Sequence, residues 1–301
     1  MWPGAEKLFA AEAQRTGVPY VLATPGNASI EEIAAIAPDV FWFQLYRFPY
    51  NDHAITLDLV RRADEAGAHV LVPTVDSAGK SKRPRDIRNG TRVPFPITPW
   101  TAYQVLTSPA WALQLLRNGV PITANLAPYA KKANQNSTAE VMQLRSGGSH
   151  TWEELARIRD KWKRPMVLKG IMHPQDAEKA VSLGVDGMFV SNHGGRQIEA
   201  LPAPIDVLPA IVKQVGKRAT VLYDSGIRSG TDVVRAYALG AAAAFAGKAF
   251  LWGLGALGEE GAAHVIDILI EETQAALGQL GALTPDAARA VVIRHNGALH
   301  F

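Results

Sequence analysis

The sequence predicts an α/β protein of the (β/α)8 TIM barrel class, N-terminally truncated so that seven of the eight strands are visible. Short apolar runs alternate with helical stretches along the 301 residues. The runs are too uniformly apolar for half-exposed strands, and this is typical of a parallel sheet that is buried on both faces. Polar side chains follow most of the runs, as they do at the catalytic face of a barrel.

Each apolar run is short enough to form one strand. The predicted strands are 18–23, 40–46, 69–75, 165–171, 187–191, 219–223 and 243–247. Such a repeat fits either a doubly wound sheet or a barrel. No GxGxxG fingerprint follows the first strand, which favours the barrel. A helix at 6–16 is the first predicted element, so we expect the first barrel strand to be missing from the N-terminus.

The predicted helices begin and end at recognisable signals. Ser29, Thr151 and Ser229 stand at N-cap positions with acidic residues in the first turn that follows, and Pro174 occupies the first position of another helix. Three glycines are expected to end helices just before a strand: Gly67, Gly184 and Gly240. The chain is therefore predicted to form one domain over 1–301.

One segment departs from this repeat. Residues 76–164 are predicted as a long loop insertion between two strands. Its polar part, 130–150, is rich in Asn, Ser and Gly and is expected to be a mobile loop or lid. A helix is predicted again over 151–162.

Composition narrows the function classes. Lys plus Arg is 31 and Asp plus Glu is 28, so the net charge is only +3, and no nucleic-acid partner is implied. A basic cluster without interleaved aromatic residues does not change this: Lys80, Lys82, Arg83, Arg85, Arg88 and Arg92. The chain has no cysteine, which excludes disulfides and thiol nucleophiles and fits a reducing, cytoplasmic location.

Metal and membrane sites are not indicated. The histidines lack the spacing of metal ligands, so no metal is expected. The stretch 236–258 is the most apolar, but Lys248 lies in its middle. It is predicted as a buried strand followed by the start of a helix, and no transmembrane segment is expected.

Polar residues at the ends of the predicted strands form the candidate site. Reading these ends in order gives Gln44 and Tyr46, Thr74 and Asp76, Lys169, Asn192 and His193, Asp224, and Gly247 with Lys248. In a barrel these ends meet at one face, where active sites are built.

The most specific element is SNHGGRQ, residues 191–197, directly after a strand. A histidine followed by two glycines is open to a ligand, and Arg196 can hold a carboxylate through two parallel hydrogen bonds. A His–Arg pair suits a base that deprotonates a substrate whose carboxylate is held. A structural histidine in a turn is the alternative interpretation. Asp76 is placed to orient His193 and stabilise its protonated form, or else to cap a turn.

A second element follows the last two strands. Residues 224–230, DSGIRSG, precede Gly247 and Lys248, in the place where many barrels bind phosphate with backbone amides and a helix N-terminus. Arg228 and Lys248 supply positive charge. Lys169 ends an apolar strand, an unusual place for a surface lysine.

Together, SNHGGRQ, VLKGI, FQLY, TVD and DSGIRSGTDVVRAYALGA resemble the FMN-dependent α-hydroxy acid dehydrogenases and oxidases, a family that includes glycolate oxidase, lactate oxidase, lactate monooxygenase and mandelate dehydrogenase. The resemblance runs from residue 2 to about residue 281. It implies a (β/α)8 barrel, FMN as the cofactor and a homotetramer.

The resemblance also implies roles. His193 would be the base, taking either the hydroxyl proton or the α-proton of the substrate, and Asp76 would pair with it. Arg196 and Arg83 would bind the substrate carboxylate, and Tyr46 would contact the substrate hydroxyl. Residues implied in flavin binding are Gln44 and Thr74 at the pyrimidine edge, Lys169 by N1 and O2, and Asp224, Ser225, Gly226, Arg228, Gly247 and Lys248 along the ribityl chain and phosphate.

The chain departs from the family pattern in places. In the family, the first strand and a tyrosine that contacts the substrate precede the position that matches Trp2. Ala23, with Thr24 beside it, stands where many members have a flavin-contacting serine, and Lys248 stands where arginine is usual.

The expected function is FMN-dependent oxidation of a lactate-like L-2-hydroxy acid to the 2-oxo acid, with O2 or a quinone or cytochrome as the electron acceptor. A non-catalytic truncated barrel that binds FMN weakly or not at all is the alternative. A different phosphate-binding barrel, such as a flavin isomerase, is disfavoured by SNHGGRQ.

Overall fold

The computed structural model describes residues 2–79, 81, 83–90, 98–291, 293 and 295–301. Lys80, Lys82 and Arg92 of the basic cluster therefore lie outside the described residues, as does the side chain of Arg85. The chain divides into two compact units. The first unit comprises Met1–Leu71, Ala78–Ser149 and Leu254–Glu260, and the second comprises Val72–Ser77, His150–Gly253 and Gly261–Phe301.

Seven strands form in the described residues, each within a predicted run. They are β1 (Tyr20–Ala23), β2 (Phe41–Leu45), β3 (Val70–Pro73), β4 (Val167–Ile171), β5 (Gly187–Val190), β6 (Thr220–Tyr223) and β7 (Ala243–Ala244). The observed strands are shorter than predicted because chain on either side already turns into loops and helices. The largest differences are at β3 and β7, and the β7 ladder continues only to the Phe245 N–H, which donates to the Tyr223 carbonyl at 2.8 Å.

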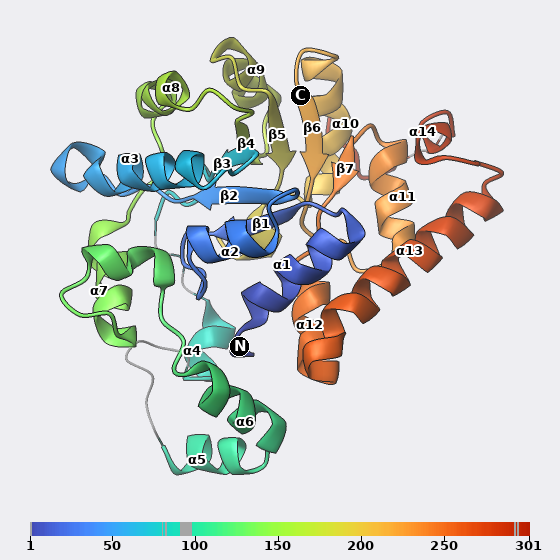
Figure 1. Ribbon diagram of the computed structural model, residues 1–301. Helices are drawn as coiled ribbons and strands as arrows, with labels where there is room; N and C mark the ends of the chain where they lie inside the picture. Colours follow the sequence, from blue (N-terminus) through green and yellow to red (C-terminus); the bar gives the residue numbers. More distant parts are fainter. Residues whose placement is uncertain (1, 80, 82, 91–97, 292, 294) are drawn as a thin grey trace. The chain divides into compact units, whose positions relative to one another are not determined.

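The strands pair in chain order. One sheet has the order β1-β2-β3 and the other β4-β5-β6-β7. Within the second unit β4, β5, β6 and β7 pair in parallel and lie side by side in Figure 1. Thr74, just past β3, forms a parallel bridge with Lys169 of β4, and the Val75 N–H donates to the Lys169 carbonyl at 2.8 Å. Parallel pairing in this order confirms the predicted β/α repeat.

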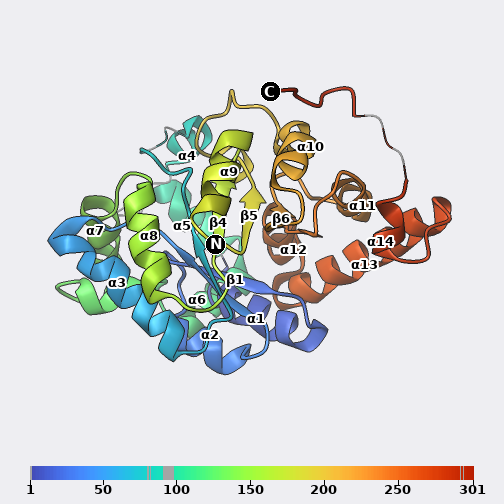
Figure 2. The same cartoon turned by 90° about the horizontal axis from the view of Figure 1, so that it is seen from above.

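Helices connect the strands, as parallel pairing requires. The α-helices are α1 (Ala5–Thr16), α2 (Ile30–Ile36), α3 (Tyr50–Glu65), α4 (Pro84–Arg88), α5 (Pro99–Leu106), α6 (Pro109–Asn118), α7 (Gln135–Arg145), α8 (Trp152–Lys161), α9 (Pro174–Ser182), α10 (Pro204–Val215), α11 (Gly230–Ala238), α12 (Lys248–Leu257), α13 (Gly261–Gln279) and α14 (Pro285–Ala288). Short 3-10 turns are η1 (Ala124–Tyr129), η2 (His193–Gly195) and η3 (Gly258–Glu260). In the second unit, α9 and α10 pack on β4, β5 and β6 (Figures 1 and 2).

The predicted helix starts are confirmed. Ser29, Thr151 and Ser229 each accept the N–H of the third helical residue, and each forms a complete capping box. Pro174 is the first residue of α9, after His173 as N-cap. The helix-ending glycines Gly67, Gly184 and Gly240 all have positive φ.

The predicted loop at 130–150 is wrong for its central part. Residues Gln135–Arg145 form α7, and Asn134 caps it by accepting the Ser137 N–H at 2.9 Å. The wider segment 76–164 carries α4 to α8 and η1 rather than a continuous loop. The helices before α8 were not predicted, because few of their described side chains are buried: none in α5, Gln114 in α6, and Thr138 and Val141 in α7. Helix α8 lies within the helix predicted over 151–162.

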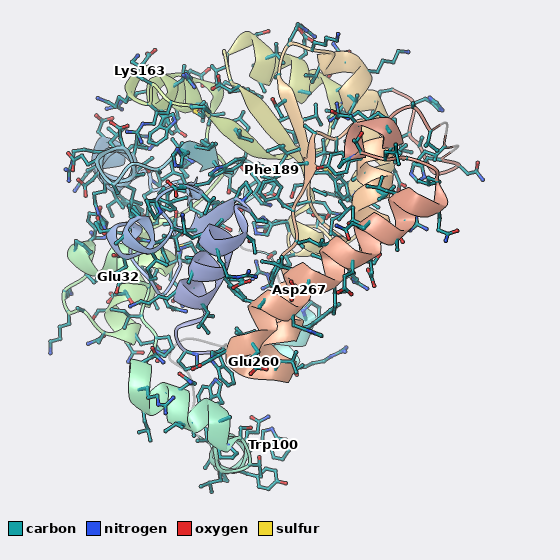
Figure 3. All side chains as sticks on the ribbon, turned by 45° about the vertical axis from the view of Figure 1, so that its right-hand side comes forward. Glu32, Trp100, Lys163, Phe189, Glu260 and Asp267 are labelled. Carbon is teal, nitrogen blue, oxygen red and sulfur yellow. The ribbon has the colours of Figure 1, made fainter. Side chains whose placement is uncertain are left out.

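The core of the second unit lies around β5, in which all four residues are buried. Phe189, labelled in Figure 3, is 2% exposed and meets Phe245 edge-on, with ring centroids 4.7 Å apart. None of the helices in the described part of the chain is long and apolar enough to cross a membrane.

Candidate active site

His193 and Asp76 form the centre of the site in the second unit. His193 begins η2, three residues after β5 ends, and Asp76 lies three residues after β3. The Nδ1 atom of His193 is 2.9 Å from Oδ1 of Asp76. Their side chains are 18% and 12% exposed, so the pair is largely shielded from water but still accessible. The two residues lie 117 positions apart, and the structure brings them together as the sequence predicted.

A glycine in β4 makes room for Asp76. Gly170 has a φ of 108° and lies at an irregularity in the register between Lys169 and Ile171. A Cβ at this position would lie 2.6 Å from the Cβ of Asp76, too close for any side chain. The sequence analysis missed this role, although a glycine inside an apolar strand is a usual sign of a bulge or a close approach.

Side chains hold the backbone turn that carries His193. His193 has a φ of 59°, in the left-handed region that costs a residue with a side chain about 1–2 kcal/mol. The N–H of His193 donates to Ser191 Oγ at 3.1 Å, that of Gly194 to Ser225 Oγ at 2.9 Å, and that of Gly195 to Asn192 Oδ1 at 3.1 Å. Each successive N–H of the turn is therefore satisfied by a side-chain oxygen.

Asp76 is also linked to a second polar pair. Ser77 Oγ lies 3.4 Å from Asp76 Oδ1, and Gln197 donates to Ser77 Oγ at 2.9 Å. The glutamine of SNHGGRQ thus reaches back toward the residue after Asp76. Oδ2 of Asp76 is buried with no hydrogen-bond partner among the described residues.

Lys169 and Asp224 form a buried ion pair. Lys169 Nζ is 2.9 Å from Asp224 Oδ2, with side chains 19% and 17% exposed. Burial raises the pKa of Asp224, but the positive charge of Lys169 and hydrogen bonds from Ser191, Lys169 and Ser225 outweigh it, and the pKa is lowered below its ordinary value. The carboxylate is therefore charged, and it balances the lysine charge within β4.

Two cationic side chains are placed at helix α12, one on the helix and one against it. Lys248 opens this helix, and its Nζ donates to the Gly194 carbonyl at 2.8 Å. The Arg228 guanidinium lies 5.2 Å from the ring centroid of Trp252, which is on the same face of α12 one turn later. A helix N-terminus beside two cations favours an anion.

This set of residues fits FMN. The flavin phosphate requires cations and free backbone amides, which Arg228, Lys248 and the start of α12 supply. Open space adjoins the backbone at this point, because a side chain at Gly247 would meet no atom within 4 Å. Lys169 offers a positive charge for the pyrimidine edge of the ring, and Asp224 and Ser225 offer acceptors for the ribityl hydroxyls.

The remaining predicted residues are distributed as follows. Arg196 is exposed, one residue after η2, and Thr74 is 1% exposed. Gln44, Tyr46 and Arg83 belong to the first unit. Gln44 is 6% exposed in β2, and Arg83 donates to Ser81 Oγ at 3.2 Å.

Thr24, beside Ala23, is buried and joins the first two strands of the first unit. Its hydroxyl donates to the Gln44 carbonyl at 2.8 Å and accepts the Tyr46 N–H at 3.1 Å. Thr24 thereby fixes the backbone on either side of Leu45, and so the end of β2 that carries Gln44 and Tyr46.

The sequence is similar to those of characterised enzymes. Residues 1–295 match the model of the family described as FMN-dependent dehydrogenase. The (S)-mandelate dehydrogenase of Pseudomonas putida is 35% identical over 291 residues, which cover 95% of this chain and 72% of that protein. The L-lactate dehydrogenase of Pseudomonas syringae pv. syringae (strain B728a) is 38% identical over 278 residues, or 92% and 72% of the two chains. The 4-hydroxymandelate oxidase of Amycolatopsis orientalis is 37% identical over 287 residues, which cover 95% of this chain and 74% of that protein.

Solved structures of the same kinds of enzyme also superpose on this chain. The crystal structure of (S)-mandelate dehydrogenase, described as a monotopic membrane protein, superposes with a TM-score of 0.88 at 34% identity and covers 95% of this chain and 75% of that one. A mandelate oxidase structure gives a TM-score of 0.75 at 36% identity, covering 95% and 72%.

These matches confirm the predicted TIM barrel class, the FMN cofactor and the assignment as an oxidoreductase. The chain belongs to the FMN-dependent dehydrogenase family, whose members similar to it act as α-hydroxy acid dehydrogenases and oxidases.

Proposed function

We propose that this protein oxidises a lactate-like L-2-hydroxy acid to the 2-oxo acid, with His193 as the base and Arg196 as the group that binds the substrate carboxylate. The observation that carries the proposal is the His193–Asp76 pair at 2.9 Å, next to the buried Lys169–Asp224 pair. A base beside a cofactor-binding lysine suits a reaction that removes two protons and two electrons from one substrate.

His193 has a defined task in this reaction. If Nδ1–H donates to Asp76, Nε2 is left as the acceptor that takes a proton from the substrate. The carboxylate then stabilises the imidazolium that forms. When bound, FMN accepts the two electrons that leave the substrate. The proton on Nε2 comes from either the hydroxyl or the α-carbon. In the first case the α-hydrogen leaves with the two electrons as hydride, and in the second the hydroxyl hydrogen leaves as a second proton, so both routes give the same 2-oxo acid.

Other residues are proposed to complete the site. Arg83 and Tyr46 would bind the carboxylate and the hydroxyl of the substrate. Gln44 and Thr74 would bind the flavin pyrimidine edge. Further proposed flavin ligands are Lys169, Asp224, Ser225, Gly226, Arg228, Gly247 and Lys248.

The substrate and acceptor are proposed from the relatives. Among these are L-lactate dehydrogenases and enzymes named for mandelate or 4-hydroxymandelate, so the acid is expected to carry either a small or an aromatic group. O2 or a quinone or cytochrome would reoxidise the flavin. A homotetramer is the proposed assembly.

Replacing Arg196 by lysine is expected to raise KM for the 2-hydroxy acid and to lower kcat, because lysine keeps the charge but loses the planar pair of donors. The wild-type enzyme should also use a 2-hydroxy amide much more slowly than the matching acid. Steady-state kinetics with both compounds measure this.

Arg218→Lys is the matched control, because Arg218 makes a two-pronged contact with Glu178 at 2.7 Å on the surface. Equal use of acid and amide by the wild type would contradict the role of Arg196.

A membrane surface is a proposed partner as well. Helices α5 and α6 pack together in the first unit, and α5 has no buried residue. Trp100, which Figure 3 shows at the outer end of this pair, stacks on Tyr103 with ring centroids 5.3 Å apart. Large apolar side chains of the pair, and Val120 two residues after it, are exposed: Trp100, Tyr103, Leu106, Leu113, Leu116 and Val120. Contiguous exposed apolar groups of this kind mark an interaction surface.

The sequence segment that carries this pair is basic, which favours an anionic bilayer. The sequence has no Asp or Glu between Asp86 and Glu140, whereas Arg88, Arg92, Arg117, Lys131 and Lys132 lie in that stretch. Apolar and aromatic side chains next to basic residues are typical of proteins that lie on a membrane surface. The similar (S)-mandelate dehydrogenase structure is described as that of a monotopic membrane protein. Binding to the cytoplasmic face of a bilayer would be compatible with the cytoplasmic location that the sequence predicts.

Leu106→Gln with Leu116→Gln is expected to lower binding to vesicles containing phosphatidylglycerol at least about tenfold, because two apolar side chains leave the bilayer. Co-sedimentation measures it, with pure phosphatidylcholine vesicles as the uncharged comparison. Leu283→Gln is the control, since Leu283 is 96% exposed in the second unit. Absence of wild-type binding to either vesicle would overturn the proposal.

A further inference from the structure

Ser191 is a buried hydroxyl for which the predicted roles leave no task. Its side chain is 0% exposed directly after β5, two residues before His193. It accepts a hydrogen bond from Lys169 Nζ at 2.9 Å and another from the His193 N–H at 3.1 Å. The hydroxyl also helps to hold the pKa of the Asp224 carboxylate below its ordinary value.

Two of these contacts use the full acceptor capacity of the hydroxyl. A serine oxygen accepts two hydrogen bonds and its hydrogen donates one. In Ser191 both acceptor positions are taken, by the lysine ammonium and by the backbone N–H, and its hydrogen remains available to the Asp224 carboxylate. A single atom therefore joins the proposed base to the proposed flavin-binding ion pair.

The backbone of His193 depends on such a contact. Its φ of 59° lies in a region that residues with side chains rarely adopt and that persists only when the surroundings enforce it. Ser191 holds the N–H of His193 itself, whereas Ser225 and Asn192 hold those of Gly194 and Gly195. Of these three contacts, the one from Ser191 is nearest to the imidazole.

We propose that Ser191 is a positioning residue that fixes the His193 backbone relative to the Lys169–Asp224 pair, so that proton removal and electron transfer occur at one defined geometry. Ser191 touches neither proton nor electron in this role and acts through His193 and Lys169. The proposal rests on the proposed function, because it takes His193 as the base and Lys169 as a flavin ligand.

The test uses the full chain reconstituted with FMN. Ser191→Ala is expected to lower kcat about 10- to 100-fold, since small misplacements of catalytic groups have effects of this size. KM should change less than kcat, because the hydroxyl does not reach the substrate. In the FMN-free protein, the dissociation constant for added FMN, measured by quenching of flavin fluorescence, should rise because Lys169 loses a partner.

A double variant separates positioning from general stability. In the His193→Gln background, Ser191→Ala should lower the residual kcat less than about threefold, because residues that act as a unit are not additive. Thr56→Val is the matched control: Thr56 is 1% exposed, and its hydroxyl exchanges hydrogen bonds with the Phe48 backbone. It should lower the thermal midpoint without changing kcat.

Ser191→Cys keeps the packing if Ser191→Ala does not fold, because a thiol has nearly the same shape and forms only weak hydrogen bonds. A kcat within about threefold of wild type in whichever Ser191 variant folds would overturn the proposal. So would a Ser191→Ala substitution that lowers kcat by the same factor in the wild-type and in the His193→Gln background. Near-normal turnover of His193→Gln alone would instead defeat the proposed function, and the FMN titration would still report on the link from Ser191 to Lys169.

Discussion

Replacement of His193 by glutamine is expected to lower kcat for the 2-hydroxy acid by about 10²–10⁴-fold, the usual contribution of a positioned general base. Glutamine is close in size and polar, but its amide cannot accept a proton at neutral pH. FMN binding should change little, because the His193 side chain pairs with Asp76 and its proposed role is toward the substrate. Steady-state kinetics and an FMN titration measure the two effects.

The chain offers a matched control for this variant. His295 Nε2 is 2.8 Å from Asp206 Oδ1, in the same unit, and its side chain is 25% exposed. It is thus a second carboxylate-paired histidine of similar burial, with no place in the proposed site. His295→Gln should keep wild-type kcat. Near-normal turnover in His193→Gln would rule out the proposed base.

Replacement of Asp76 by asparagine should lower kcat by a comparable factor, about 10²–10⁴-fold. The carboxylate accepts Nδ1–H and leaves Nε2 ready to take a proton. An amide that turns its NH2 group toward Nδ1 favours the opposite tautomer, and it carries no charge to stabilise the imidazolium. The substitution nearly conserves volume, so the close approach to Gly170 is kept.

The measurement for this second variant is kcat together with the thermal midpoint. The midpoint should fall only slightly, whereas kcat falls strongly. Asp206→Asn is the control, because it removes the carboxylate from the other His–Asp pair. If Asp76→Asn lost no more activity than Asp206→Asn, Asp76 would be a turn residue, the alternative that the sequence left open.

Much of this arrangement could be predicted from local sequence. The apolar runs identified all seven strands of the described residues, because buried parallel strands have a strong compositional signal. The N-caps at Ser29, Thr151 and Ser229 were predicted because capping depends on neighbouring residues. Strand-end position alone also favoured Asp76 and His193 as partners.

Contacts that depend on packing could not be predicted. Nothing in the sequence indicated that Lys169 pairs with Asp224, which lies 55 residues later, or that Ser191 joins both to His193. Gly170 matters because of the Asp76 side chain across the neighbouring strand, which a single strand's pattern does not show. Helix α7 buries only Thr138 and Val141 of its side chains, so it has no apolar periodicity to detect.

The central claim is that His193, paired with Asp76, removes a proton from an L-2-hydroxy acid while FMN takes two electrons. Mixing the FMN-loaded protein with L-lactate or (S)-mandelate in the absence of oxygen, and recording the flavin absorption band, tests it most directly. The expected result is rapid loss of the band with at least one L-acid, no loss with its mirror image, and slow loss in His193→Gln. A band that persists with every L-2-hydroxy acid, yet disappears with a chemical reductant, would contradict the claim.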